Sequence, residues 1–323
     1  MVLLVTGVAG FVGAHVAQAL LARGERVVGV DNLNSYYSPA LKQARLARLQ
    51  QQAGFSFHQL DVSNPEALEA LRQAEPDIRG IFHMAAQAGV RYSLTDPYVF
   101  AGTNVCGHVA VLEFARRLRR LEHLVYASSS SVYGGNTRLP FSETDPVDQP
   151  GSFYAVTKRS AELTSVAYSH LYGLPQTGLR FFTVYGPWGR PDMAYYSFAR
   201  AIMAGQPVTL YEGDALARDF TYIDDVTRAV LAVYAHPPAP DQPRILNVGN
   251  DRPESVRHLV SLLEQHLGRT AQIALQPRPG ADVERTWANI SAIHALTGWK
   301  PSTTLEKGIG HFVSWLRESG LER

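Results

Sequence analysis

Short apolar runs rich in β-branched residues alternate with longer amphipathic stretches through the first half of the chain. The short runs predict strands over residues 2–5, 27–30, 55–60, 80–84, 123–127 and 177–182. Apolar residues at helical spacing predict helices over 11–23, 65–73, 103–118 and 154–172. Gly24 and Gly173 stand where helix C-caps are expected. This alternation predicts an α/β fold, with a parallel sheet covered by helices on both faces.

The pattern changes after about residue 187. Helices are predicted over 195–204, 224–235, 256–267 and 305–317, between short strands and joints rich in Pro and Gly. We expect residues 188–323 to form mainly a smaller mixed α/β lobe. The apolar run over 244–248 predicts a strand that returns to the main sheet or its edge.

Composition narrows the function classes. The 323 residues are 46% hydrophobic, which suffices for a large core, and the formal net charge is +1. No strong field therefore attracts nucleic acid or an anionic membrane. Because no apolar run is long enough for a signal peptide or a membrane span, a cytoplasmic protein is expected.

Metal and disulfide chemistry are not expected. The single cysteine, Cys106, excludes an internal disulfide framework and a cysteine-rich zinc site. Its place in the helical pattern over 103–118 predicts a buried spectator. The histidines show no metal-binding spacing, so no metal site is predicted.

A glycine-rich turn follows the first predicted strand and opens the first predicted helix. Gly7, Gly10 and Gly13 have the spacing GxxGxxG, with Phe11 and Val12 between the last two. In dinucleotide-binding folds such glycines permit the tight turn, the approach of a pyrophosphate and close helix packing. We therefore predict a doubly wound Rossmann-type domain over residues 1–187. The alternative is a turn without a ligand, but the strand before it and the helix after it argue against that.

Acidic residues end the second and third predicted strands. A carboxylate at Asp31, followed by Asn32, would accept hydrogen bonds from ribose hydroxyls and repel a 2′-phosphate, so NAD is favoured over NADP. The alternative is an aspartate in a surface turn. Asp61 and Val62 stand where an adenine amino group is met, and the alternative for Asp61 is a cap on the next helix.

Tyr154 and Lys158 are the candidate proton-transfer pair. They are four residues apart in a predicted helix and so share one face. An ammonium near a phenol favours the phenolate, which predicts a lowered pKa for Tyr154 and suits a general base. The alternative is a tyrosine and a lysine on a solvated helix face.

Seven motifs occur together in one order along the chain. They are TGVAGFVG at 6–13, HMAAQAG at 83–89, Asn104, ASSSSVYG at 127–134, Tyr154 with Lys158, RFFTVYGP at 180–187 and RDFTYIDD at 218–225. In these the chain resembles the extended short-chain dehydrogenase/reductase family, and within it the nucleotide-sugar 4-epimerases. The resemblance implies NAD as cofactor, a UDP-sugar as substrate and a homodimer formed by the helices over 103–118 and 154–172. Val105, Val109, Leu112 and Val166 offer apolar stripes for that dimer, although they could equally face the sheet.

The resemblance also implies roles for individual residues. Tyr154 removes the proton of the sugar 4-hydroxyl while hydride passes from C4 to NAD, Ser129 hydrogen-bonds that hydroxyl, and Lys158 holds the nicotinamide ribose. The 4-keto sugar then turns over and takes the hydride back on its other face. The implied cofactor-binding residues are Gly7, Gly10, Phe11, Val12, Gly13, Asp31, Asn32, Asp61, Val62, Ala85, Ala86, Tyr154 and Lys158.

Ser130 and Ser131 bear on the reaction class. Related dehydratases and decarboxylases carry carboxylic acids at these positions, so epimerisation is the reaction that remains. Segments 31–39, 88–93 and 185–193 resemble UDP-glucuronate 4-epimerases in particular. A glucuronate carboxylate requires several donors, which Arg190, Ser130, Ser131 and Thr183 would supply. The alternative for Arg190 is a surface arginine paired with Asp192.

The implied substrate-binding residues are Arg91, Ser129, Ser130, Ser131, Tyr154, Thr183, Arg190, Arg218 and Arg278. Arg218 and Arg278 are candidate ligands of the UDP diphosphate, although Ala281 departs from the family pattern near Arg278. Arg91 either reaches phosphates or forms a structural salt bridge.

Two further residues are expected to act as supports. His83 is expected in the core, and Asn104 is expected to bind a backbone carbonyl near the site or a water. Two other functions remain open: a UDP-glucose or UDP-N-acetylglucosamine 4-epimerase, and a non-enzymatic NAD-sensing scaffold.

Overall fold

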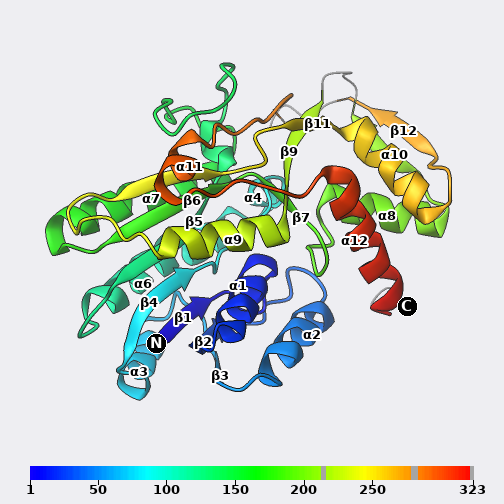
Figure 1. The fold of residues 1–323 in the computed structure, drawn as a ribbon. Helices are drawn as coiled ribbons and strands as arrows, with labels where there is room; N and C mark the ends of the chain where they lie inside the picture. Colours follow the sequence, from blue (N-terminus) through cyan, green and yellow to red (C-terminus); the bar gives the residue numbers. More distant parts are fainter. Residues whose placement is uncertain (212–215, 278–282, 321–323) are drawn as a thin grey trace.

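The computed structural model describes residues 1–211, 216–277 and 283–320, and a seven-stranded sheet lies at its centre (Figure 1). The strand order is β10-β6-β5-β4-β1-β2-β3, and every pairing is parallel. The strands are β1 Val2–Thr6, β2 Arg26–Asp31, β3 Phe55–Gln59, β4 Ile78–His83, β5 His123–Ser129, β6 Gln176–Phe181 and β10 Arg244–Val248. The predicted α/β fold with a doubly wound parallel sheet is confirmed.

Helices cover both faces of the sheet because its strands are apolar on both sides. In β1, Leu3 and Val5 pack into one core cluster with helices α1 (Phe11–Ala22) and α9 (Ile223–Tyr234). Leu4 points the opposite way, into a second cluster with α3 (Pro65–Ala74) and α6 (Gly107–Arg116). The alternation follows the two-residue period of a strand. Because all pairings are parallel, the carboxyl ends of the strands lie at one edge of the sheet.

Helix α7 (Phe153–Tyr172) carries Tyr154 and Lys158. The Ser152 side chain caps its first turn by accepting from the Ala155 N–H, and the helix ends at Gly173, whose φ is 66°. Only glycine adopts this left-handed conformation without strain, and the predicted C-cap at Gly173 is confirmed.

The predicted helix over 103–118 is wrong in its first part. Residues Ala101–Cys106 form a π-helical segment, η1, and the α-helix proper begins at Gly107. The wider turn shifts the side-chain register, so that Asn104 and His108 face inward while Cys106 faces outward. Cys106 is exposed, and the prediction of a buried cysteine is therefore wrong.

Helix α2 (Pro39–Gln50) has no counterpart among the predicted helices. Its buried residues include Lys42 and Arg45 beside Leu41, Leu46 and Leu49, so basic side chains interrupt the apolar stripe. The helix packs against α1 and continues the segment that follows β2.

The remaining elements build a smaller lobe and the connections to it. Helices α8, α10 and α12 gather with β8 and β12 on the side of the molecule away from α3 and α6 (Figure 1). Two small sheets have the orders β11-β9-β7 and β12-β8. The elements are α4 Tyr92–Thr95, α5 Pro97–Phe100, η2 Ser130–Tyr133, β7 Thr183–Tyr185, α8 Ala194–Ala204, β8 Val208–Tyr211, β9 Ala217–Tyr222, β11 Pro253–Ser255, α10 Val256–Leu267, β12 Ile273–Gln276, α11 Ser291–Thr297 and α12 Leu305–Glu318. No helix in the described parts of the chain is both long and apolar enough to cross a lipid bilayer.

Candidate active site

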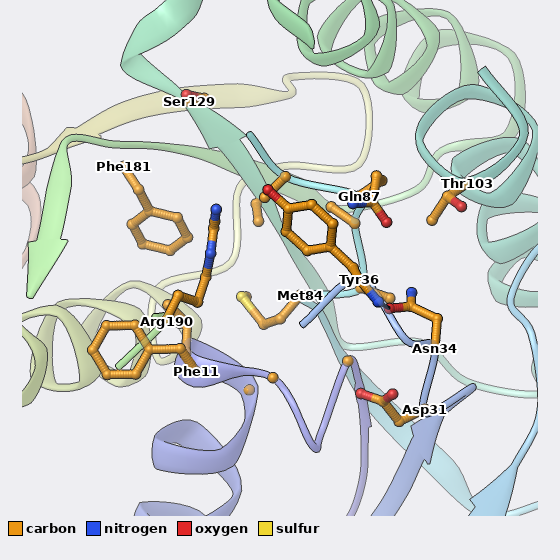
Figure 2. A pocket seen from close by; sticks show the side chains of 18 of the residues that line it. Phe11, Asp31, Asn34, Tyr36, Met84, Gln87, Thr103, Ser129, Phe181 and Arg190 are labelled. Atoms are coloured by element: carbon orange, nitrogen blue, oxygen red, sulfur yellow. Dashed lines mark hydrogen bonds between the residues drawn. The ribbon is translucent and has the colours of Figure 1, made fainter. Parts of the chain in front are cut away.

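Two adjoining cavities lie at the carboxyl edge of the sheet. The first cavity, of about 240 Å³, is lined by residues that follow β1, β2, β4 and β5 and by α7. The second cavity, of about 870 Å³, lies between this edge and the smaller lobe. Tyr36, Arg190 and Met193 line both. Figure 2 shows the side chains of Tyr36 and Arg190 directed into the space between Asp31 and Ser129.

The glycine-rich turn forms one wall of the first cavity. Gly7 has φ of 69°, and a Cβ placed there would lie 2.7 Å from the Ala85 nitrogen. A Cβ at Gly13 would lie 2.1 Å from the Gly7 oxygen. Helix α1 begins after Gly10 without a side-chain cap, which leaves N–H groups of its first turn for an anion. The turn therefore has the shape and polarity that a dinucleotide pyrophosphate requires.

Asp31 lies beneath this turn. Its carboxylate accepts from the Ala9 N–H at 3.1 Å and from the Leu33 N–H at 2.8 Å, and it lines the first cavity with Asn32. At 9% exposure it is not an aspartate of a surface turn, so that alternative is wrong. Phe11, Val12, Val62, Ala85 and Ala86 also line the first cavity.

Several residues of the first cavity were not predicted as site residues, among them the polar residues Lys42, Asn34 and Gln87. Lys42 donates from Nζ to the backbone oxygen and to Oδ1 of Asn34, both at 2.7 Å, and both residues line the cavity. Burial lowers the pKa of Lys42. Lys42 was not predicted as a site residue because no helix was predicted over residues 39–50. Gln87 also lines this cavity, and its buried Nε2 has no hydrogen-bond partner among the described residues, which suits a ligand acceptor.

Asp61 lies outside the set of residues that line the first cavity. Its carboxylate accepts from the Ser63 N–H and hydroxyl, at 2.8 and 2.6 Å, and from Asn32 Nδ2 at 2.8 Å. These hydrogen bonds lower the pKa of Asp61 although burial acts in the opposite direction. The cap of α3 is Asn64, so the alternative that Asp61 caps this helix is wrong.

Tyr154, Lys158 and Ser129 come together at the other end of the first cavity. Lys158 Nζ donates to the Ala127 oxygen at 2.9 Å and lies 5.8 Å from the centre of the Tyr154 ring. Burial lowers the pKa of Lys158 to about 8, and the charge of Glu162 opposes that effect. Tyr154, Lys158 and Ser129 thus lie together, and their roles in proton transfer stay a prediction.

The pKa of Tyr154 departs from the expectation. Burial raises it, while hydrogen bonding to Ser129 and the positive charge of Arg190 lower it. Burial outweighs both, so the shift is opposite to the one predicted from the spacing of Tyr154 and Lys158. The reason is that a phenolate inside the protein loses its hydration.

Arg190 is paired with Asp192 and nonetheless lines both cavities. Its Nε donates to Oδ1 at 3.0 Å and its Nη2 to Oδ2 at 2.5 Å, while the Tyr36 hydroxyl donates to Oδ2 at 3.1 Å. Burial raises the pKa of Asp192, but the charge and hydrogen bonds of Arg190 and Tyr36 bring the net value below its ordinary range. Thr183 lines the second cavity.

Ser130 and Ser131 begin η2, directly after Ser129. The Ser131 N–H donates to Ser129 Oγ at 3.2 Å, and the Ser131 hydroxyl is buried without a hydrogen-bond partner among the described residues. Neither serine lines the two cavities.

The other predicted arginines lie at the second cavity or outside the described residues. Arg91 stacks on the Tyr211 ring at 4.8 Å, and Arg218 donates from Nη1 to the backbone oxygens of Ala217 and Glu284. Both line the second cavity. Arg278 lies outside the described residues.

Two polar residues support the site from the core, as expected. Asn104 donates from Nδ2 to the Gln87 oxygen at 2.9 Å and accepts from the Gln87 N–H at 2.8 Å. His83 is buried against the Thr6 hydroxyl at 2.7 Å, and burial holds its pKa well below the ordinary value. In the described ranges no group of three or more His, Cys, Asp or Glu residues is arranged to hold a metal ion.

Known proteins are similar to this chain in sequence and in fold. The model of the NAD dependent epimerase/dehydratase family matches residues 3–249. UDP-glucuronate 4-epimerase 1 of Arabidopsis thaliana is 46% identical over 97% of this chain and 76% of that protein.

Two solved structures superpose on nearly the whole chain. A Bacillus cereus UDP-glucuronic acid 4-epimerase, in complex with UDP-glucuronic acid and NAD, has a TM-score of 0.92 and 32% identity, covering 99% of this chain and 100% of that one. A Thermotoga maritima UDP-glucose 4-epimerase with UDP-glucose has a TM-score of 0.89 and 29% identity, covering 99% of both chains. The chain belongs to the NAD-dependent epimerase/dehydratase family, which confirms the expected enzyme class and its cofactor, NAD.

Proposed function

We propose that this enzyme interconverts UDP-glucuronate and UDP-galacturonate by NAD-dependent 4-epimerisation through a transient 4-keto sugar. The observation that supports this best is the position of Arg190. It lines the wall shared by the two cavities, and its charge acts on Tyr154, the proposed base. An acidic sugar placed against Tyr154 would therefore meet a cation.

The protein side chains divide the proton transfer among them. The glycine-rich turn and Asp31 would hold NAD, which would supply the hydride acceptor and donor for the sugar C4. Tyr154 takes the proton of the 4-hydroxyl, and Ser129 hydrogen-bonds to the same oxygen. Lys158, held by the Ala127 carbonyl, orients the ribose beside Tyr154. Because burial raises the pKa of Tyr154, the two groups that lower it, Ser129 and Arg190, increase the fraction of phenolate that is available as the base.

Arg190 has donors left for a substrate carboxylate. Its Nε and Nη2 donate to Asp192, whereas Nη1 does not, and the Tyr36 hydroxyl lies within hydrogen-bonding reach of the guanidinium. Thr183 contributes a hydroxyl at the second cavity. A carboxylate held by such donors gains charge-assisted hydrogen bonds that a neutral hydroxymethyl group does not.

The absence of acids beside Ser129 sets the outcome of the reaction. With serine at 130 and 131, no carboxylic acid follows Ser129 to assist elimination or decarboxylation. A 4-keto uronate is a β-keto acid, so holding its carboxylate in place also protects it from loss of CO₂. Reduction of the ketone on the other face is then the remaining step.

The UDP part of the substrate is assigned to the second cavity. Its volume of about 870 Å³ accommodates a nucleotide, and Arg91 and Arg218 supply positive charge for the diphosphate. Ser130 and Ser131 line neither cavity, so neither serine is assigned a contact with the sugar.

We also propose a homodimer that uses the outer face of α7. Val156, Leu163 and Val166 lie on one face of this helix and are 42%, 54% and 37% exposed. For Leu112 the sequence left open whether it lies in this interface or faces the sheet. It is fully buried in the core and faces the sheet. An exposed apolar stripe of this kind is typical of a protein interface.

The deciding experiment is chromatography of products after the purified protein is incubated separately with UDP-glucuronate, UDP-glucose and UDP-N-acetylglucosamine. UDP-galacturonate as the fastest product supports the proposal. Faster turnover of a neutral sugar would establish the alternative 4-epimerase, and no turnover of any sugar would favour the NAD-sensing scaffold.

A further inference from the structure

Arg45 of α2 is a buried residue that connects separate loops. It is 1% exposed and is not among the residues that line either cavity. Its Nη1 donates to the Ala9 oxygen at 3.0 Å and to the Tyr37 hydroxyl at 2.6 Å. Nε and Nη2 donate to the Trp188 oxygen at 2.9 and 2.6 Å, and Nη2 also donates to the Gly189 oxygen at 2.9 Å.

The five hydrogen bonds end on four neutral acceptors, which are three backbone carbonyl oxygens and one phenol oxygen. A buried guanidinium is costly unless its N–H groups are hydrogen-bonded. Here Nη1 binds one pair of residues, and Nε and Nη2 bind a separate loop. Ala9 lies within the glycine-rich turn, whereas Trp188 and Gly189 immediately precede Arg190. One side chain therefore joins the wall of the first cavity to the loop that carries Arg190.

The Trp188–Gly189 turn needs such support. Trp188 has φ of 62°, a left-handed conformation that is unfavourable for a bulky side chain. At Gly189 a Cβ would lie 1.6 Å from the Tyr195 hydroxyl oxygen, so the backbone is pressed against α8. Because the turn is unfavourable by itself, the hydrogen bonds from Arg45 contribute to holding it.

We propose that Arg45 is a positioning residue, which fixes the Trp188–Gly189 turn against the glycine-rich turn and so sets the place of Arg190 between the two cavities. This rests on the proposed function in one respect, that Arg190 distinguishes an acidic from a neutral sugar. Its structural part, that Arg45 immobilises the turn, does not depend on the substrate.

The binding test is a double-mutant cycle. All titrations use NAD-containing protein with Tyr154→Phe, in which turnover should be slowed by roughly 10²–10⁴ while sugar nucleotides still bind, and compare UDP-glucuronate with UDP-glucose by calorimetry. Arg45→Met should reduce the preference for UDP-glucuronate by about tenfold, the loss expected for a charge-assisted hydrogen bond. Arg190→Ala should do the same, and the double variant should lose little more, because both changes act through one interaction.

The matched control is Arg48→Met on the same helix. The Arg48 guanidinium stacks on the Trp188 ring at 4.5 Å but donates no hydrogen bond to the turn, so Arg48→Met removes a ring contact alone and should reduce the preference much less than Arg45→Met. Arg45→Lys keeps the charge without the fork and should be intermediate. If Arg45→Met does not fold, Arg45→Lys replaces it in the double-mutant cycle.

Hydrogen–deuterium exchange tests the structural part with no substrate present. Amides of residues 186–193 should exchange faster in Arg45→Met and Arg45→Lys than in the wild type or Arg48→Met. Unchanged exchange, or additive losses in the cycle, would overturn the proposal. If the wild type does not prefer UDP-glucuronate, the proposed function fails, and the exchange measurement still decides the role of Arg45.

Discussion

Lys158 donates its hydrogen bond to the backbone oxygen of Ala127, 2.9 Å away, and not to Tyr154. The lysine is thereby anchored to the end of β5, next to Ser129, while its ammonium stays 5.8 Å from the centre of the phenol ring. Burial costs this ammonium its hydration, and the buried carboxylate of Glu162, one turn further along α7, opposes the loss of its charge.

We expect the rate of turnover to fall as the pH rises through about 8. The pKa of Lys158 is lowered to about 8, so Lys158 loses its charge there instead of near its ordinary 10.5. Between these values the unfolded chain binds the extra proton, and the contribution of Lys158 to the free energy of unfolding therefore increases with pH even as activity declines. A pH–rate profile and denaturant unfolding across pH 7 to about 10 check the two opposite trends.

Glu162→Gln should move the fall in turnover to lower pH, because the charge that opposes deprotonation of Lys158 is removed. The control is Glu113→Gln, which removes a carboxylate of α6 that does not contribute to the pKa of Lys158. If turnover of Glu162→Gln falls at the same pH as in the wild type, Lys158 does not set the pH of that fall.

Tyr154→Phe should reduce turnover by roughly 10²–10⁴ and leave binding of UDP-sugars within a few-fold. The ring stays in place against Phe100, with centroids 6.0 Å apart, and only the proton acceptor is lost. Initial rates and calorimetric binding measure the two effects. Activity close to that of the wild type would remove Tyr154 from the mechanism.

Arg190→Ala should impair UDP-glucuronate by about ten- to a hundredfold in kcat/KM, because a charge-assisted hydrogen bond is worth roughly 1.5–3 kcal/mol. UDP-glucose should be relatively spared, and the share of UDP-pentose by-product should rise as the 4-keto acid is held less firmly. Product analysis by chromatography measures all three. An equal loss for acidic and neutral sugars would contradict the role of Arg190 in recognising a carboxylate.

Purified protein should carry tightly bound NAD, since an epimerase regenerates its oxidant in each cycle. Absorbance and mass of the nucleotide released by denaturation identify it. Because the Asp31 carboxylate lines the first cavity, a 2′-phosphate should be excluded. Recovery of NADP, or full dependence on added cofactor, would contradict the assignment of Asp31.

Sedimentation should show a dimer at micromolar concentration. Val166→Asp places a charge in the exposed stripe of α7 and should give monomers that remain folded by circular dichroism, because this residue is 37% exposed. A wild-type monomer at the same concentration would reject the proposed interface.

The sequence by itself determined the framework of the site. The strands of the first half were predicted to within two residues at each end, because a parallel sheet buried on both faces requires continuous apolar runs. The glycine-rich turn and the pair Tyr154 and Lys158 could equally be recognised, since the spacing of these residue types is a local feature of the sequence. The family likeness followed from the same local motifs.

Only the tertiary structure decided what depends on distant parts of the chain. Arg45 and Lys42 lie on a helix whose apolar stripe they interrupt, and their roles follow from contacts with Trp188, Gly189 and Asn34. The outward position of Cys106 follows from a π-helical segment that no short-range pattern marks. The raised pKa of Tyr154 and the pairing of Arg190 depend on burial and on distances between separate elements. Packing of the whole chain sets these quantities, and for that reason they could not be read from spacing along the sequence.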